Sequence, residues 1–260
     1  MTGPAPPDWR LPPGVNRALW EYAHTPRLAE DEDDYFANSS LCLADERYLA
    51  DRFVEPGPLI DLGCGAGRHA LQFAQRGFDV VAVDLSHAML RQVRTKARRL
   101  GTRVTIVQAN LCRLGCFPDR SFQYALSMFS TLGMVRGAKA RRVALSEAHR
   151  VLGPGGRLAL HAHNLWLNLA DPQGRRWLAS RWRGLLLGDP VAADRRMSYR
   201  GIENLEVHLY RWGELKRDLT SAGFRIDEVI PLDGTTATPI RRPRLAHALR
   251  AGGWLVFASV

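Results

Sequence analysis

A glycine-rich turn between an apolar strand and a helix is the feature that most constrains the fold of this 260-residue chain. Residues 59–68 have the sequence LIDLGCGAGR, in which an apolar run contains Asp61 and leads into three alternate glycines. Because glycine has no Cβ, such a turn lets a ligand approach the bare backbone before the following helix. The next apolar run, residues 78–84, ends in Asp84, which is placed to hold a ribose diol. Together the two segments predict a nucleoside-binding α/β domain.

The spacing of Gly63, Gly65 and Gly67 separates this turn from two other nucleotide-binding turns. A dinucleotide fingerprint has the pattern G-x-G-x-x-G, and a phosphate-cradling P-loop continues with Lys-Ser or Lys-Thr. The pattern here is D-x-G-x-G-x-G, and Arg68 follows it. The spacing therefore favours neither a dinucleotide site nor a P-loop.

With these motifs the chain resembles the class I S-adenosylmethionine-dependent methyltransferases. Residues 61–67 match the first motif of the family and Asp84 the second, and the resemblance continues through Asn110-Leu111 and residues 150–156. It covers residues 55–165 well and the C-terminal part loosely. The resemblance implies an α/β fold with a Rossmann-like, seven-stranded, mostly parallel sheet, helices on both faces and the last strand antiparallel. It also implies S-adenosyl-L-methionine as the cofactor.

Strands and helices alternate after residue 55, which is typical of a parallel sheet. We expect the strands at residues 59–62, 80–84, 104–108, 122–128, 157–161, 225–232 and 254–260. We expect the helices between them at residues 68–76, 87–100, 138–152 and 212–222. Ser86 is a suitable N-cap for the second of these helices, and Gly101 a suitable residue to end it.

The remaining segments suggest a single domain at 15–260 behind a proline-rich, disordered tail at 1–14. Two helices, 15–25 and 41–53, would form an N-terminal cap (15–54) in front of the cofactor-binding core (55–163). Residues 164–205 would be an inserted lid, and residues 206–260, with a short strand at 206–210, would complete the sheet.

The lid assignment depends on where the insertion leaves the sheet. Residues 164–200 contain three tryptophans and seven arginines, and they follow the carboxyl end of a strand, where ligands bind in such sheets. A loop whose solvated helix is packed by its tryptophans is the alternative interpretation.

The resemblance assigns a role to each cofactor-binding candidate. The backbone of residues 63–67, including Cys64, would approach the amino acid part and the ribose. Asp61 would hold the ammonium group, and Asp84 would accept both ribose hydroxyls. Asn110, where relatives often carry an acid, would bind the adenine amino group, against which Leu85 could pack. The full set of candidates is Asp61, Gly63, Cys64, Gly65, Gly67, Asp84, Leu85, Asn110, Leu111 and Ser127.

Methyl transfer is an in-line displacement from a positive sulfur, so an enzyme contributes mainly by positioning the reactants. His161 and His163 end the fifth expected strand and share one side of it by the two-residue repeat. Imidazole titrates near neutral pH, so either histidine is a candidate general base, with His163 preferred. Hydrogen-bonded structural histidines are the alternative. No Asn-Pro-Pro-Tyr motif follows the fourth strand, which argues against methylation of a flipped base.

The net charge of +10 raises the question of a nucleic-acid partner. Of the 36 basic residues, only Lys96, Lys139 and Lys216 are lysines, and such an arginine bias also arises from a GC-rich genome. We therefore expect a small-molecule methyl acceptor. RNA, tRNA in particular, and a non-catalytic role as a cofactor-binding partner protein are the alternatives. An aminopropyl transferase is less consistent with the chain, because no acidic pair stands near the fourth strand.

The remaining composition favours a cytoplasmic protein. The four cysteines, Cys42, Cys64, Cys112 and Cys116, form no C-x-x-C pair, so we expect neither a disulfide framework nor a metal site. No apolar run approaches the ~20 residues that span a bilayer, so we expect no membrane partner. The N-terminal segment also lacks the apolar core of a secretion signal.

Overall fold

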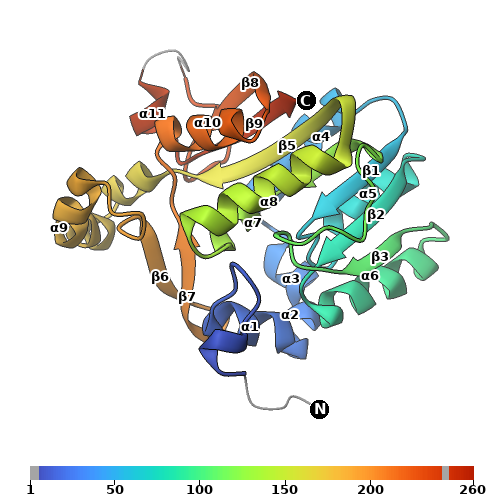
Figure 1. Cartoon of the computed structure of the whole chain (residues 1–260), viewed down its shortest axis with the longest axis horizontal. Helices are drawn as coiled ribbons and strands as arrows, with labels where there is room; N and C mark the ends of the chain where they lie inside the picture. Colours follow the sequence, from blue (N-terminus) through green and yellow to red (C-terminus); the bar gives the residue numbers. More distant parts are fainter. Residues whose placement is uncertain (1–5, 242–245) are drawn as a thin grey trace.

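The computed structural model of the chain describes residues 6–241 and 246–260, and a seven-stranded sheet runs through its centre (Figure 1). The strand order is β3-β2-β1-β4-β5-β9-β8. Strands β1 to β5 pair in parallel, whereas β9 is antiparallel to both of its neighbours, so the predicted fold class is confirmed. The strands are β1 (Pro58–Leu62), β2 (Asp79–Asp84), β3 (Thr105–Gln108), β4 (Phe122–Ser127), β5 (Leu152–His163), β8 (Arg225–Leu232) and β9 (Gly253–Ser259).

Helices cover both faces of the sheet, each over its own apolar core. One core includes Leu49, Phe73 and Val93, which come from helices on one face. The other core includes Leu145 and Leu215 from helices on the opposite face. The first three helices are α4 (Ser40–Arg52), α5 (Arg68–Gln75) and α6 (His87–Arg99), and the other two are α8 (Ala138–Val151) and α10 (Trp212–Ser221). Two short helices, α7 (Thr131–Met134) and α11 (His247–Arg250), lie in the connections.

Local signals place most of these elements within one or two residues of their predicted bounds. The side chain of Ser86 accepts a hydrogen bond from the N–H of Met89, as expected for the N-cap of α6. Strand β5 is the exception, because it begins at Leu152 instead of Arg157. Its pairing with β4 shifts between Leu152 and Arg157, so the glycine-rich segment between them is an irregularity inside the strand.

The N-terminal cap contains more helix than the sequence predicted. The acidic residues 30–34 fall at the end of α2 (Pro26–Glu30) and in α3 (Glu32–Phe36). These two helices lie between α1 (Arg17–His24) and α4. Pro26 at the start of α2 and three acids in the first turn of α3 both favour helix N-termini.

Part of the segment predicted as a tail lies on the core. Residues 1–5 are outside the described part of the chain, and Asp8–Arg10 form a short 3₁₀ helix, η1. The carbonyl of Pro13 accepts from the Asn110 side chain at 2.8 Å, and the carbonyl of Gly14 accepts from the N–H of Arg136 at 2.7 Å. These two bonds join the N-terminal segment to the loops after β3 and α7.

The insertion after β5 consists of a helix and a separate β-hairpin. It contains η2 (Leu165–Leu169), α9 (Pro172–Leu187), β6 (Asp194–Tyr199) and β7 (Ile202–His208). The hairpin β6–β7 is antiparallel and forms its own two-stranded sheet. Figure 1 shows α9 at the left edge of the molecule and the hairpin running from it towards α1. The insertion therefore extends to residue 208, beyond the predicted end at 205, and the expected strand at 206–210 is the second half of this hairpin.

Within residues 6–241 and 246–260, no helix combines the length and the apolar character needed to cross a bilayer.

Candidate active site

A cavity of about 280 Å³ lies at the carboxyl ends of the central strands, between the sheet and the caps. Its floor comes from the loops after β1, β2, β3 and β4 and from the end of β5. Its cover comes from α1, α3 and the hairpin β6–β7. The floor includes Asp61, Gly63, Cys64, Gly65, Asp84, Leu85, Asn110, Leu111, Phe129, Ser130 and His163. The cover includes Leu19, Tyr22, Glu32, Phe36, Met197, Tyr199, Leu205 and Val207.

The turn after β1 leaves bare backbone facing this cavity. Gly63 and Gly65 have positive φ angles of 80° and 54°, a region that favours glycine. A Cβ on Gly63 would overlap the Thr131 side chain, and a Cβ on Gly65 would overlap Glu32. Glycine is thus required at both positions, and a ligand can approach the chain more closely there than any side chain would allow.

Asp84 is fixed at the tip of β2 by two backbone donors. Its Oδ2 accepts from the N–H of Gly65 at 2.9 Å, and its Oδ1 accepts from the N–H of Ser86 at 2.8 Å. Burial raises the pKa of this carboxyl, although the two hydrogen bonds oppose the shift. Each carboxylate oxygen can accept a second hydrogen bond, so the group remains able to bind a diol.

Asp61 is a buried carboxyl with one oxygen that has no partner among the described residues. Burial, and then the charge of Asp84, raises the pKa of Asp61 to about 7. Such an oxygen is costly to bury unless a ligand completes its hydrogen bonding.

Glu32 is a cavity residue that the sequence did not single out, because only its place in an acidic stretch marked it. Its Oε1 accepts from the N–H of Ala66 at 2.9 Å, so α3 is attached to the glycine turn itself. Burial raises the pKa of Glu32 to about 7. The hydrogen bond from Ala66 opposes this shift, and the charge of Asp84 adds to it. The cavity therefore brings three carboxyls, Glu32, Asp61 and Asp84, to one turn.

These features fit the two ends of S-adenosylmethionine that differ most in polarity. The three carboxyls suit the ammonium group of the amino acid end and a ribose diol, and the bare backbone of the turn admits them. Apolar side chains from Leu85, Met89 and Leu111 line the floor beside Asp84, where an adenine would pack.

Asn110 lines the cavity, but both ends of its side chain already have partners. Its Oδ1 accepts from the N–H of Cys112 and its Nδ2 donates to the carbonyl of Pro13, each at 2.8 Å. These bonds form a local turn and attach the N-terminal segment. One lone pair on Oδ1 and one proton on Nδ2 remain, so binding of the adenine amino group by Asn110 stays a prediction.

His163 reaches the cavity from the end of β5. Its ring lies 5.0 Å from that of His161 and 6.4 Å from that of Phe129, as the shared face of the strand predicted. Its backbone N–H donates to the Ser130 hydroxyl at 3.3 Å. Burial lowers the pKa of His163 to about 4, so the imidazole is neutral at physiological pH.

The loop that faces His163 holds two residues in a strained backbone conformation. Phe129 and Ser130 have positive φ angles of 53° and 60°, which non-glycine residues rarely adopt. Backbone strain of this kind is concentrated at functional sites. It occurs just after β4 ends, in a loop that lines the cavity.

Three predicted site residues do not border the cavity. Gly67 is the N-cap of α5, and a Cβ there would lie 2.8 Å from Cγ2 of Val93, so its role is helix packing. Ser127 is buried within β4, before the chain reaches the cavity. His161 is buried against Gly253, and its Nδ1 has no partner within the part of the chain that the structure describes.

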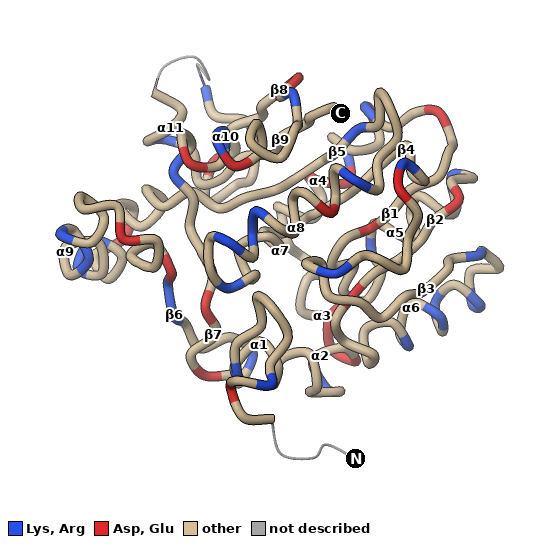
Figure 2. The backbone as a smooth tube through the Cα atoms, in the orientation of Figure 1, with Lys and Arg blue, Asp and Glu red and all other residues tan. Residues whose placement is uncertain are grey.

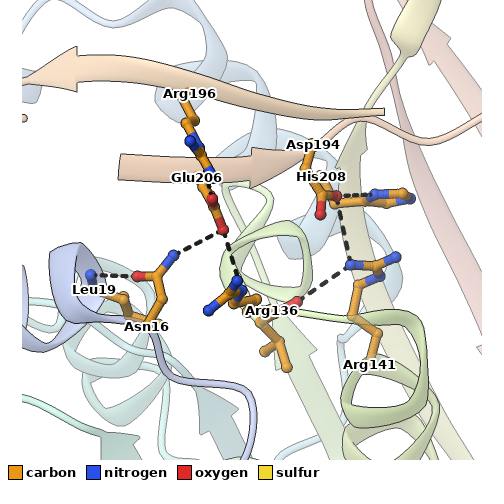
Figure 3. Close-up of polar contacts among 9 residues, drawn as sticks. Asn16, Leu19, Arg136, Arg141, Asp194, Arg196, Glu206 and His208 are labelled. Carbon is orange, nitrogen blue, oxygen red and sulfur yellow. Dashed lines mark hydrogen bonds and ion pairs between the residues drawn. The ribbon is translucent and has the colours of Figure 1, made fainter. Parts of the chain in front are cut away.

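Polar contacts join the two parts of the cover (Figure 3). Glu206 of β7 accepts from Asn16 at 2.9 Å and from Arg196 at 2.8 Å, and it pairs with Arg136 at 3.5 Å. Asn16 donates to Glu206 through its amide nitrogen, and it is also the N-cap of α1, since its side-chain oxygen accepts from the N–H of Leu19. The hairpin and α1 are therefore held together by one carboxylate.

A second group of polar contacts fixes the base of the hairpin to the core. His208 joins Asp194 at 2.6 Å and Glu214 at 2.9 Å, and buried Arg141 lies 3.9 Å from Asp194 (Figure 3). Burial lowers the pKa of His208, but its two carboxylate partners outweigh burial and hold the pKa above its usual value. The protonated ring can donate to both acids at once.

A Rossmann-like sheet with an antiparallel last strand, a glycine turn and an acid at the tip of β2 is the arrangement of a nucleoside-binding methyltransferase domain. Residues 59–156 match a family model described as a methyltransferase domain. Over these residues the predicted resemblance to the class I S-adenosylmethionine-dependent methyltransferases is confirmed, and the predicted cofactor is that of the family.

Known methyltransferases resemble this chain, in sequence over part of its length and in fold over most of it. The chain is 35% identical over 118 residues to a demethylmenaquinone methyltransferase from Thermus thermophilus, which is 44% of this chain and 51% of that protein. It thus spans about half the length of the curated relatives it matches. A methyltransferase structure from Methanosarcina mazei has a TM-score of 0.64 at 23% identity, over 81% of this chain and 96% of the other.

A second solved structure holds both a methyl acceptor and the demethylated cofactor. It is the 1,6-didemethyltoxoflavin-N1-methyltransferase of Burkholderia thailandensis with 1,6-didemethyltoxoflavin and S-adenosylhomocysteine bound. Its TM-score is 0.57 at 20% identity, over 90% of this chain and 84% of the other. At this identity the likeness concerns the fold.

Proposed function

We propose that the protein transfers the methyl group of S-adenosylmethionine to a small, largely apolar, ring-containing acceptor. The observation that supports this most strongly is the division of the cavity into two parts. Its three acids lie around the glycine turn, whereas the cover presents mainly aromatic and aliphatic side chains, such as Phe36, Met197 and Tyr199. An apolar cover that leaves few polar groups for an acceptor favours a flat or aliphatic molecule.

The relatives support a ring-containing acceptor. The Thermus protein is named for demethylmenaquinone, and the Burkholderia structure contains 1,6-didemethyltoxoflavin. RNA is less well supported as a substrate, because no arginine of residues 175–200 is among the described residues that line the cavity.

The chain's own residues divide the work of binding and transfer. S-adenosylmethionine supplies, when bound, an electrophilic methyl group on a positive sulfur. Asp84 would hold the ribose diol and Asp61 the ammonium group, which would leave the part of the cavity lined by Phe129 and His163 to the acceptor. Positioning donor and acceptor in line is the largest contribution expected here, because displacement at a methyl carbon needs little other help.

His163 is the residue proposed to take a proton from the acceptor where the acceptor atom carries one. The ring is neutral, lines the cavity and lies beside the loop that ends β4. As the new bond to the methyl carbon forms, the carbon–sulfur bond breaks and its electron pair stays on sulfur. The acceptor proton would then move to a free ring nitrogen of His163.

Calorimetric titration with S-adenosylhomocysteine tests the cofactor half of this proposal. The wild type is expected to bind in the micromolar range, and Asp84→Ala to bind about 100-fold more weakly, because two charge-assisted hydrogen bonds are lost. Asp79→Ala, at the exposed start of the same strand, should bind like the wild type. Equal affinity for the wild type and Asp84→Ala would refute the assigned role.

A transfer assay tests the acceptor half. The protein is incubated with methyl-labelled S-adenosylmethionine and either a panel of hydroxylated naphthoquinones and phenols or bulk RNA. Label on members of the panel supports the proposal. Label on RNA alone would favour the RNA alternative, and bound cofactor without any transfer in a cell extract would favour a non-catalytic role.

A further inference from the structure

The solvent-facing side of α9 carries arginines together with large apolar side chains. The sixteen residues of the helix contain no acid. Trp182 is 56% exposed, Leu186 75% and Leu187 86%, which is unusual for such side chains in a folded domain. We call the following exposed residues the α9 surface: Arg175, Arg176, Arg181, Trp182, Arg183, Leu186 and Leu187.

The α9 surface is held rigidly because the opposite side of the helix is packed. Leu178 and Leu185 contact Leu165 and Leu209 in a small apolar cluster of their own. Asp171 caps the first turn, and Arg211 donates to the carbonyl of Leu185 at 3.3 Å. The exposed apolar residues are therefore displayed by a fixed helix at the edge of the molecule (Figure 1).

The apolar residues gather at the C-terminal end of α9. Trp182 and Leu186 are four residues apart, so they lie one turn apart on the same side of the helix. Leu187 follows before Gly188 ends the helix in a left-handed conformation, and exposed Val191 comes shortly afterwards. The basic residues extend along the rest of the helix, where Figure 2 shows blue segments and no red ones.

We propose that the α9 surface binds to the interface of an anionic lipid bilayer. Tryptophan and leucine gain free energy by leaving water for the boundary between headgroups and acyl chains. Arginines beside them are attracted to anionic headgroups, and their long side chains reach the headgroups while the apolar tip inserts. The α9 surface offers both interactions on one helix that has no acid to oppose them.

Two other occupants fit the same surface less well. RNA would use the arginines and Trp182, but Leu186 and Leu187, the most exposed of these side chains, gain nothing from phosphates and do not stack on bases. A second copy of this chain in a two-fold dimer would place the four arginines of one α9 against those of the other. Like charges in such an interface repel each other.

The position of α9 connects this surface to the cavity. The helix leads directly into the hairpin, whose Met197 and Tyr199 line the cavity. Leu209, in the cluster beneath α9, also lines the cavity. A bilayer bound at α9 would therefore lie beside the apolar cover. The proposal does not depend on which acceptor is methylated.

Flotation of the whole protein with lipid vesicles tests the proposal. The vesicles are phosphatidylcholine with 30% phosphatidylglycerol, or phosphatidylcholine alone. The wild type is expected to float with the anionic vesicles and much less with the neutral ones. The variant Leu186→Ser/Leu187→Ser should lose at least about tenfold in partition coefficient. Leu100→Ser, at an exposed leucine after α6, is its matched control and should bind like the wild type.

A charge-matched pair separates the α9 surface from the general basicity of the protein. Arg176→Gln/Arg183→Gln should weaken binding by about 30-fold, because each arginine near the membrane surface contributes about fivefold. Arg91→Gln/Arg94→Gln removes the same charge from exposed positions on α6 and should have little effect. Unchanged binding of S-adenosylhomocysteine shows that each variant is folded.

Several outcomes would overturn the proposal. One is that the wild type does not bind vesicles, and another is that the α6 and α9 charge variants lose vesicle binding equally. They also include a dimer that dissociates in Leu186→Ser/Leu187→Ser without any vesicle binding, and RNA binding that requires Arg176 and Arg183 in a protein that ignores vesicles.

Discussion

Lowering the pH from 7.5 to 6 is expected to weaken the binding of S-adenosylmethionine strongly, because the carboxyls around the glycine turn would be protonated. Burial raises the pKa of both Glu32 and Asp61 to about 7. Above that pH the two groups are ionised and attract the cationic cofactor, and below it they are neutral. The sign is therefore fixed, since affinity rises with pH through this range.

The magnitude follows from the fraction of each group that is ionised. With a pKa of about 7, roughly 76% of each carboxyl is ionised at pH 7.5 and roughly 9% at pH 6. If the complex requires one group to be ionised, affinity falls about eightfold, and if it requires both, it falls about 70-fold. Calorimetry should also detect the release of about one proton at pH 7 when titrations in buffers of different ionisation enthalpy are compared.

The variant Glu32→Gln assigns the effect to this residue. Glutamine keeps an oxygen to accept from Ala66 N–H but does not titrate, so the dependence should fall from about 70-fold to about eightfold. Asp34→Asn changes an exposed acid of the same helix and should retain the full dependence. The upper limit of pH 7.5 keeps more than half of the cofactor's own amine protonated, because α-amino groups titrate near pH 7.7 to 8.0.

Two results would refute this reasoning. Equal affinity at pH 6 and pH 7.5 in the wild type would mean that neither carboxyl contributes charge to the bound cofactor. Full pH dependence in Glu32→Gln would mean that Glu32 only fastens α3 to the turn, and that the charge of the site comes from Asp61 and Asp84 alone.

Other features of the site lead to three further predictions. Gly67→Ala should lower the free energy of unfolding by about 2 kcal/mol, because the alanine Cβ would press on Val93 and the backbone has a positive φ there. Urea unfolding measures this loss, and adding Val93→Ala to the same chain should recover part of it. Glu206→Ala should raise the KM for the acceptor several-fold and leave the Kd for S-adenosylhomocysteine unchanged, since only the cover is loosened; equal changes in both would contradict this. His163→Gln should lower the rate constant of methyl transfer about 100-fold in single-turnover assays, with little change in cofactor affinity. Because the pKa of His163 is about 4, this rate constant in the wild type should show no titration of this residue between pH 6 and 8.

The geometry of the glycine turn and of the tip of β2 was predictable because its signals are local in the chain. The alternate glycines, the acid at the end of β2 and the N-cap Ser86 each act within a few residues of their own position. Gly67 shows the limit of this reasoning. The motif groups it with Gly63 and Gly65, yet the constraint on it comes from Val93, a residue of another helix.

The cover could not be predicted because its contacts join distant segments. Glu206 binds Asn16 across 190 residues, and Glu32 binds Ala66 across 34. Strand β6 contains neighbouring arginines and shows no clean alternation of polar and apolar residues, so its pairing with β7 has no strong local pattern. The bond from Asn110 to the carbonyl of Pro13 is hidden from local reasoning in the same way, since the two residues are 97 positions apart.

The arrangement of acids and apolar side chains also bears on the rate of transfer. The sulfonium loses its charge as the methyl group leaves, so an acid close to the sulfur would stabilise the reactant more than the transition state. Among the described residues that line the cavity, the acids are Glu32, Asp61 and Asp84, and all three lie at the glycine turn.

Apolar surroundings for the acceptor favour the transition state over the reactant, unlike an acid close to the sulfonium. Positive charge becomes more dispersed in the transition state with a neutral acceptor, and surroundings that exclude water penalise dispersed charge less than concentrated charge. Met197 and Tyr199 of the hairpin and Phe129 of the strained loop supply such surroundings. With the proposed function, the acids would serve cofactor binding at one end of the cavity, and the cover would serve methyl transfer at the other. This explains why a hairpin distant in sequence has to be fixed so firmly to α1.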